Sequence, residues 1–223
     1  MFKTNQMSKR ALGAFALVVA AVAAAPAGAL AATANDQTQF SVTGGSLSFF
    51  PAPAMPTLTG ITLNGQAQTT NSTMTNFTVR DATGSGSGWN VTVSGNNAGG
   101  KSAVFAQYCP TGTCGMDTGP GYVSSGQTLP ANSLTLTSTG GSFSAQNGST
   151  GTAPTLQCSS GCNVDSASAV KVASAAANAG MGTWATTGWS GTSLALSTPT
   201  TLKTLQAGEV YRVDLVWSIN SGP

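Results

Sequence analysis

Residues 211–220 alternate between apolar and polar side chains, with Val216 as the single exception, and this pattern restricts the segment to a β-strand. One face of that strand carries Tyr211, Val213, Leu215, Trp217 and Ile219. The sequence ends four residues later at Pro223. We therefore expect neither a membrane tail nor a covalent sorting signal at this end.

The first residues have the charged, apolar and small-residue order of a secretory signal. Lys3, Lys9 and Arg10 precede an apolar run over residues 11–30, and we expect cleavage after Ala31. The alternative is an uncleaved membrane anchor, but the run is mostly Ala and its drive into lipid is weak. If the exported protein stays at a cell surface, we expect it to do so by non-covalent binding.

Removal of residues 1–31 leaves one predicted domain, residues 32–223, with a changed charge balance. The full chain has 8 basic and 6 acidic residues, and three of the basic ones lie in the signal segment. Five basic residues then face six acidic ones, which gives a net charge of −1. Because no basic cluster remains, a nucleic-acid or anionic-membrane partner has no electrostatic basis.

Short alternating segments separated by turn residues follow the signal, as is typical of a sandwich or barrel. The alternation is clearest in five segments: residues 46–49, 77–80, 89–94, 134–136 and 194–196. We predict an all-β fold, a single antiparallel β-sandwich or barrel-like domain with long disulfide-bearing loops. The predicted domain is long enough to fill one core.

Four further segments need separate predictions. Residues 81–88 are rich in Gly and Ser and predict a hairpin turn or a sandwich corner. Residues 58–63 carry Leu and Ile after a Pro-rich stretch and read as a further alternating segment. The long connection between residues 93 and 134 has the length of a functional loop. Residues 164–179 are rich in Ala and predict a helix capped at Asp165 or Ser166.

The four cysteines form two close pairs in the sequence, Cys109 with Cys114 and Cys158 with Cys162. In an exported protein this spacing favours two disulfides, each closing a small loop. Four thiolates are also compatible with a zinc site, an alternative that export disfavours. Because four cysteines allow three pairings, the connectivity stays open here.

The chain contains no histidine, which excludes Ser-His-Asp and Cys-His catalysis and every metal site that needs imidazole. We expect no cofactor, no metal and no enzymatic activity. Paired carboxylates for sugar hydrolysis are the remaining simple alternative. Glu209 and Asp214 are five positions apart, so within a single strand they would point to opposite faces.

The two tryptophan-bearing segments together resemble the WxL domain of Gram-positive surface proteins. That family has one Trp-x-Leu motif within the sheet and a second near the C-terminus, with a Tyr before the second Trp and a Pro after it. The first motif corresponds here to Trp89 and Val91, and the second to Tyr211, Trp217, Ile219 and Pro223. The chain is identified as a divergent, stand-alone member.

Val91 and Ile219 stand where the family motif has Leu, and both keep an apolar group on the Trp face. The two cysteine pairs are not part of the usual pattern, so the resemblance says nothing about the long loops. It implies a secreted protein at the cell wall. The implied partner is peptidoglycan or another wall glycan, with other surface proteins as further partners.

The four tryptophans have different expected roles. Trp89 and Trp217 are in phase with apolar neighbours, so we expect their rings in the core. Trp184 and Trp189 lie in a polar segment, where they either stack on sugar rings or close one end of the sandwich. Tyr122 is a third candidate for glycan contact.

These observations predict a secreted wall-binding protein that catalyses nothing. A second hypothesis is a structural subunit of a surface fibre or coat, assembled through an exposed edge strand such as the C-terminal one. A third is a glycan hydrolase that uses carboxylates.

Overall fold

A computed structural model describes residues 36–223, and the predicted signal segment, residues 1–31, lies outside the described residues. Every regular element within residues 36–223 is a β-strand, and every strand pair is antiparallel. The all-β antiparallel fold predicted from the alternation is therefore confirmed. The chain divides into two units, residues 1–41 and 42–223, and all the strands belong to the second.

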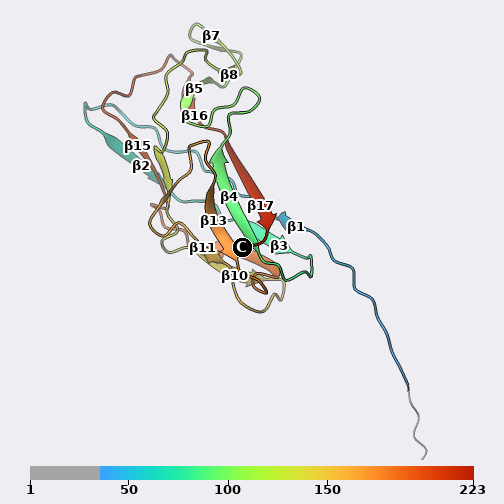
Figure 1. Cartoon of the computed structure of the whole chain (residues 1–223). Coiled ribbons are helices and arrows are strands. Elements are labelled where there is room, and N and C mark those ends of the chain that lie inside the picture. Colours follow the sequence, from blue (N-terminus) through green and yellow to red (C-terminus); the bar gives the residue numbers. More distant parts are fainter. Residues whose placement is uncertain (1–35) are drawn as a thin grey trace, which may run out of the picture. The chain divides into compact units, whose positions relative to one another are not determined.

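Three four-stranded sheets enclose the core of the second unit (Figure 1). We name them front, back and side for a viewer placed behind the molecule in Figure 1, so the sheet named back lies nearer the reader in that figure. The front sheet has the order β1 (Leu47–Phe49), β3 (Thr78–Asp81), β14 (Gly182–Thr187) and β10 (Ser142–Gln146). The back sheet has the order β11 (Thr155–Leu156), β13 (Val170–Ala175), β4 (Trp89–Gly95) and β17 (Leu215–Ser221). The side sheet has the order β12 (Cys162–Asn163), β9 (Leu134–Leu136), β15 (Leu194–Thr198) and β2 (Gln68–Ser72).

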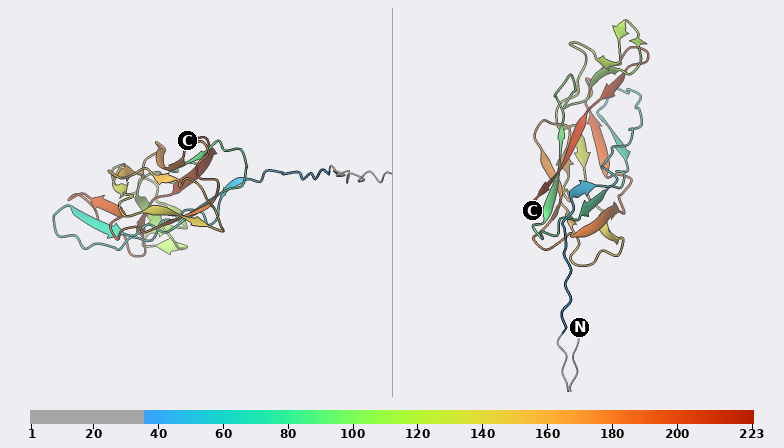
Figure 2. Two further views of the ribbon diagram at one scale, coloured as in Figure 1. Left: turned by 90° about the horizontal axis from the view of Figure 1, so that it is seen from below. Right: turned by 90° about the vertical axis from the view of Figure 1, so that its right-hand side faces the viewer.

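The long connection between β4 and β9 is not a structureless loop, because it builds most of a small sheet at one end of the second unit. This end sheet has the order β16 (Val210–Arg212), β5 (Ala106–Cys109) and β8 (Gly121–Tyr122). A hairpin of β6 (Thr113–Cys114) and β7 (Asp117–Thr118) projects next to it. Figures 1 and 2 show the end sheet and the hairpin together, away from β10 and β11.

Strands β4 and β17 pair along their whole length at one side of the back sheet. Trp217 lies opposite Val93, and Ile219 lies opposite Val91. Paired residues point to the same face, so the apolar residues of the closing strand join those of the mid-chain strand. Trp89, Val91 and Val93 have no exposed surface. The alternation read in both segments therefore corresponds to one shared buried face.

Aromatic rings join the front and back sheets across the core. The ring centroids of Trp89 and Phe143 are 5.9 Å apart, and those of Trp217 and Phe77 are 6.1 Å apart. Phe77 and Phe143 themselves meet edge to face at 6.1 Å. Such pairs add to the apolar burial that holds the sheets together, about 0.5–1.5 kcal/mol each.

The helix predicted over residues 164–179 is wrong, because this segment contains β13. That strand lies between β11 and β4, and tertiary pairing outweighs the helical propensity of its Ala residues. The proposed cap, Asp165, is instead fully buried. Its two carboxylate oxygens accept hydrogen bonds from the backbone N–H groups of Ser133 and Leu134, both at 2.9 Å.

The Gly- and Ser-rich segment after β3 is a sandwich corner, because β3 lies in the front sheet and β4 in the back sheet. A chain of hydroxyls orders this corner. The Thr83 hydroxyl donates to Asp81 at 2.6 Å and contacts the Ser85 hydroxyl at 2.9 Å. The Ser87 hydroxyl then links Ser85, at 2.9 Å, to Ser221 of β17, at 2.8 Å. The corner is thus held against the closing strand.

Candidate functional site

One face of the end sheet presents aromatic and charged side chains together. Tyr108 of β5 lies opposite Tyr122 of β8 and opposite Val210 of β16. Arg212 shares this face because it is two residues from Val210 along the same strand. Gln107 and Cys109 alternate to the other face and are buried. The alternation of β5 therefore separates an accessible face from a buried one.

The accessible side chains contact one another closely. The rings of Tyr108 and Tyr122 are 5.0 Å apart at 71°, and the Arg212 guanidinium lies 4.4 Å from the Tyr108 ring centroid. Arg212 forms an ion pair with Asp214 at 2.7 Å. The Tyr122 hydroxyl donates to the other carboxylate oxygen of Asp214 at 2.5 Å. We call Tyr108, Tyr122, Arg212 and Asp214 the tyrosine face.

The ionisation of the tyrosine face is fixed by these contacts. Burial raises the pKa of Tyr122, and its hydrogen bond to Asp214 raises it further, so the hydroxyl stays a donor. Burial alone would raise the pKa of Asp214, but the hydrogen bonds from Tyr122 and Arg212 outweigh it and lower that pKa. The face therefore carries one carboxylate and one guanidinium, whose side chain is 45% exposed.

This arrangement is suited to binding. Aromatic rings present flat apolar faces, and the charged pair supplies hydrogen-bond donors and acceptors at their edge. Sequence reasoning named Tyr122 but missed Tyr108. The available signal was the position of the two tyrosines on either side of the first cysteine pair.

The two candidate tryptophans lie elsewhere. Trp184 belongs to β14 and is only 4% exposed, and its indole N–H donates to the carbonyl of Met181 at 2.9 Å. Its burial fits the closing of the sandwich rather than an exposed stacking surface. Trp189 is half-buried against the core, with its indole N–H 3.2 Å from the Thr186 hydroxyl. The structure therefore does not bring the tryptophans together with Tyr122 in one sheet.

The motif residues of the two tryptophan segments lie in or against the core. Trp89 and Val91 are fully buried, and the Trp89 indole N–H donates to the carbonyl of Gly180 at 3.1 Å. Tyr211, Trp217 and Ile219 are partly buried and pack against the same core. The single strand expected over residues 211–220 is divided in the structure. Tyr211 belongs to β16, and only Trp217 and Ile219 lie on β17, opposite Val93 and Val91 of β4.

The cysteines form two disulfides, Cys109–Cys114 and Cys158–Cys162, so the pairing is local and the zinc alternative is wrong. Cys109 follows Tyr108 directly, so the first disulfide ties β5 to the β6–β7 hairpin. A short closed loop of this kind restricts the chain locally. It thereby stiffens the strand that positions Tyr108.

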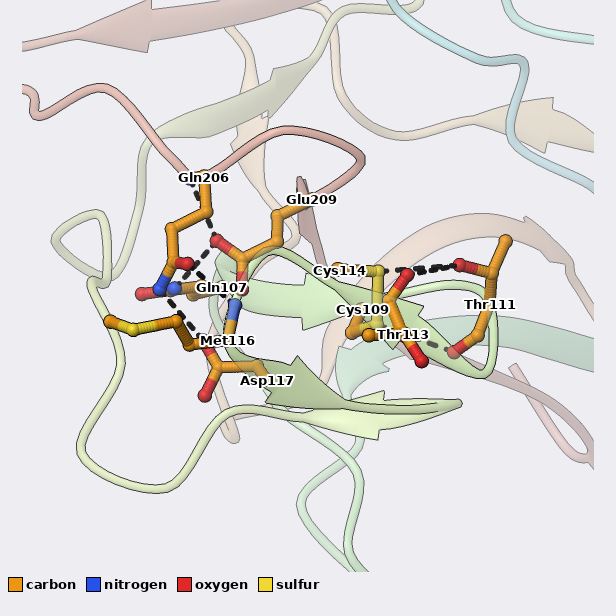
Figure 3. Close-up of a disulfide and its surroundings, with 9 residues drawn as sticks. All are labelled: Gln107, Cys109, Thr111, Thr113, Cys114, Met116, Asp117, Gln206 and Glu209. Atoms are coloured by element: carbon orange, nitrogen blue, oxygen red, sulfur yellow. Dashed lines mark hydrogen bonds between the residues drawn. A yellow bond between two sulfur atoms is a disulfide. The ribbon is translucent and has the colours of Figure 1, made fainter.

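Two carboxylates, Asp117 of the hairpin and Glu209, both accept hydrogen bonds from Gln206 next to the end sheet (Figure 3). Glu209 accepts hydrogen bonds from Gln107 Nε2 at 2.7 Å and from the Gln206 backbone N–H at 2.9 Å. Asp117 accepts from Gln206 Nε2 at 3.1 Å. A hydrogen bond shared with Glu209, partial burial and the Glu209 charge raise the pKa of Asp117. This pair connects the hairpin to the chain before β16.

Glu209 and Asp214, which would point to opposite faces within a single strand, do not lie in a common strand. Glu209 precedes β16, and Asp214 lies between β16 and β17. Each belongs to its own hydrogen-bond network. Among residues 36–223, no group of three or more His, Cys, Asp or Glu side chains is placed to hold a metal ion. The described part of the chain also contains no helix long and apolar enough to cross a membrane.

Comparison with known proteins adds one match. The profile of a family described as "WxL domain surface cell wall-binding" matches residues 50–223, which is more than half of the chain. No curated protein and no solved structure matches the sequence. The matched range contains every strand after β1.

Proposed function

Because the chain belongs to the WxL domain family of surface cell-wall-binding proteins, we propose that it binds the peptidoglycan of a Gram-positive wall through the tyrosine face. The family places the protein at the cell surface and makes the wall its partner in general terms. The choice of peptidoglycan and of this face is our proposal. It rests on the one observation that two tyrosine rings in edge-to-face contact share a surface with an ion pair.

The chemistry of a glycan strand suits this surface. Sugar rings have apolar C–H faces that pack on aromatic rings, while their hydroxyl and N-acetyl groups exchange hydrogen bonds at the edges. Arg212 and the carboxylate of Asp214 supply such bonds next to Tyr108. The negative charge of stem-peptide carboxylates suits the exposed guanidinium.

A shallow face gives weak individual contacts, and a wall compensates by repetition. Many identical sites on one polymer raise the effective concentration of the next site after the first has bound. The Cys109–Cys114 disulfide next to Tyr108 lowers the cost of ordering the face on binding. Binding without catalysis is sufficient for this role.

Co-sedimentation with purified wall material tests the proposal. The exported protein should pellet with sacculi stripped of accessory polymers, and the variant Tyr108→Ser, Arg212→Gln should stay in the supernatant. Val216→Ser is the matched control, because Val216 is 45% exposed on the outer side of β17. Trp189→Phe tests the remaining predicted tryptophan contact in the same assay.

The assay tests the proposed ligand and the proposed surface separately. If the protein pellets only with walls that keep their accessory polymers, the ligand is an accessory wall glycan and not peptidoglycan. Full retention of the Tyr108→Ser, Arg212→Gln variant would remove the tyrosine face as the site. Circular dichroism of each variant should match that of the parent protein, which shows that lost binding is not lost folding.

A further inference from the structure

An open apolar groove of about 1070 Å³ lies beside the closing strand. Leu194 and Leu196 of β15 line one part of it, and Leu215 and Trp217 of β17 line another. Residues 53–63 form a further wall. The sequence predicted another alternating segment at residues 58–63, but the structure has no strand there. No strand formed by residues 58–63 covers the groove, so its apolar residues stay open on that side.

Strand β17 offers backbone groups next to this groove. It is the last strand of the back sheet and pairs only with β4. The Asn96 N–H donates to the Asp214 carbonyl, and the Gly222 N–H donates to the Gly88 carbonyl. The backbone N–H and C=O groups of the even-numbered residues of β17 thus point toward β4. Those of Leu215 and Trp217 point to the open side.

The open part of this edge is the half of β17 that begins at Leu215. Strand β1 lies next to the other half, toward the C-terminus, but does not pair with it (Figures 1 and 2). An unpaired edge with apolar side chains beneath it is a template for an added strand. An added strand would point every second side chain into the groove. Apolar side chains such as Phe and Val suit its apolar lining.

A segment with the required pattern exists in the same chain. Residues 36–43, which we call the arm, are exposed, belong to no strand and form no backbone–backbone hydrogen bond with described residues. Phe40 is 90% exposed and Val42 is 80% exposed. They lie two residues apart, so they share one face of an extended arm, while Gln39 and Ser41 face the other way.

We propose that the arm of one copy adds to the free edge of β17 in a second copy and inserts Phe40 and Val42 into its groove. The spacing of Phe40 and Val42 equals that of Leu215 and Trp217, so the four side chains lie on one face of the extended sheet. Asp36 of the arm also has a charge opposite to that of Lys203, an exposed residue that lines the groove. Lys203 forms no ion pair within the described residues.

Each copy carries both an arm and a groove, so the contact is head to tail. Such a contact produces a reciprocal dimer when two copies close on each other and an open fibre when they do not. The groove and the tyrosine face share Arg212, but Tyr108, Tyr122 and Asp214 do not line the groove. The variants that test the assembly lie in the arm and at Leu63, so its failure is distinguishable from failure of the proposed wall binding.

Light scattering of the exported protein over a concentration series provides the first test. The mean mass should rise with concentration, and the variant Phe40→Ser, Val42→Ser should remain monomeric. Gln39→Ser, Ser41→Ala is the matched control and should assemble like the parent protein. Both arm variants change exposed residues only, so their folding is not at risk. A parent protein that is monomeric at every concentration would overturn the proposal.

A peptide with the sequence of residues 36–43 provides the second test, with the monomeric arm variant as receptor. The peptide should bind and change the tryptophan emission, and a peptide with Ser at positions 40 and 42 should bind about 10- to 100-fold more weakly. Leu63→Asp in the receptor should weaken binding, because Leu63 lines the groove and is 42% exposed. Val216→Asp on the outer side should not. Equal binding of both peptides, or none, would contradict the proposal.

Discussion

Trp89 and Trp217, which are 128 residues apart in the sequence, lie on one buried face of a single antiparallel strand pair, with Trp217 opposite Val93 of β4. Phe77 and Phe143 of the facing sheet connect them through edge and tilted ring contacts. The mid-chain and closing strands of the family motif therefore act as one packing unit. Its two indoles differ in burial, and this difference can be measured.

Truncation of the two indoles should have unequal effects on stability. Trp89→Ala should lower the free energy of unfolding by about 3–5 kcal/mol, because it empties a fully buried site and leaves the Gly180 carbonyl unpaired. Trp217→Ala should cost about 1.5–3 kcal/mol, because that ring is only partly buried and lines the groove. Equilibrium unfolding in urea measures both. Equal losses would contradict the packing described here.

A second prediction concerns the glycines of the sandwich corner. Gly88 has a φ of +73°, and a Cβ there would lie 2.4 Å from the Ala175 carbonyl oxygen. Gly84 has a similar φ of +69° but open space around it. Gly84→Ala should cost about 1–2 kcal/mol from backbone strain alone.

Gly88→Ala should cost about 1–3 kcal/mol more than Gly84→Ala, because the added methyl group also displaces the neighbouring backbone. The same urea unfolding experiment compares the two variants, and Gly84→Ala is the control for the shared φ. A difference below the error of measurement would mean that β4 and β13 can separate freely at this point.

The strands around the tryptophans could be predicted from the sequence because period-two alternation survives where one face is buried. The local disulfides also followed from spacing and export. The β13 strand could not be predicted, because Ala and Ser favour no strand by themselves. Its conformation depends on β4 and β11, which are distant in the sequence.

The candidate site was harder to predict because it depends on long-range pairing. Tyr108 meets Arg212 only because β5 pairs with β16, about a hundred residues further along the chain. Trp184 was misleading for another reason. Its polar neighbours suggested a loop. In the structure Thr186 is buried, and its hydroxyl donates to the Phe77 carbonyl. A buried hydroxyl with a backbone partner allows this polar sequence to form a core strand.

A third prediction tests the buried carboxylate of Asp165. Asp165→Asn should lower the free energy of unfolding by about 1–3 kcal/mol, because an amide has one acceptor oxygen and two backbone N–H groups need one each. Asp36→Asn is the matched control, since Asp36 is exposed, and its effect should lie within about 0.5 kcal/mol. A neutral Asp165→Asn would show that Ser133 and Leu134 find other acceptors.

The last prediction concerns pH and the carboxylate pair of Asp117 and Glu209. The hydrogen bond with Glu209, partial burial and the Glu209 charge raise the pKa of Asp117 above its ordinary value of 3.8. The folded protein therefore holds a proton here more tightly than the unfolded chain. The stability from this proton is present below pH 3.8 and is lost as the pH rises through the raised pKa.

Asp117→Asn should remove this part of the pH dependence, because an amide donates to Glu209 at every pH without adding charge. We expect its melting temperature to exceed that of the parent protein at neutral pH and the two to converge in acid. Asp36→Asn, at an exposed residue, is the control for the removal of one carboxylate. Parallel profiles of Asp117→Asn and the parent protein would show that Asp117 and Glu209 do not share a proton.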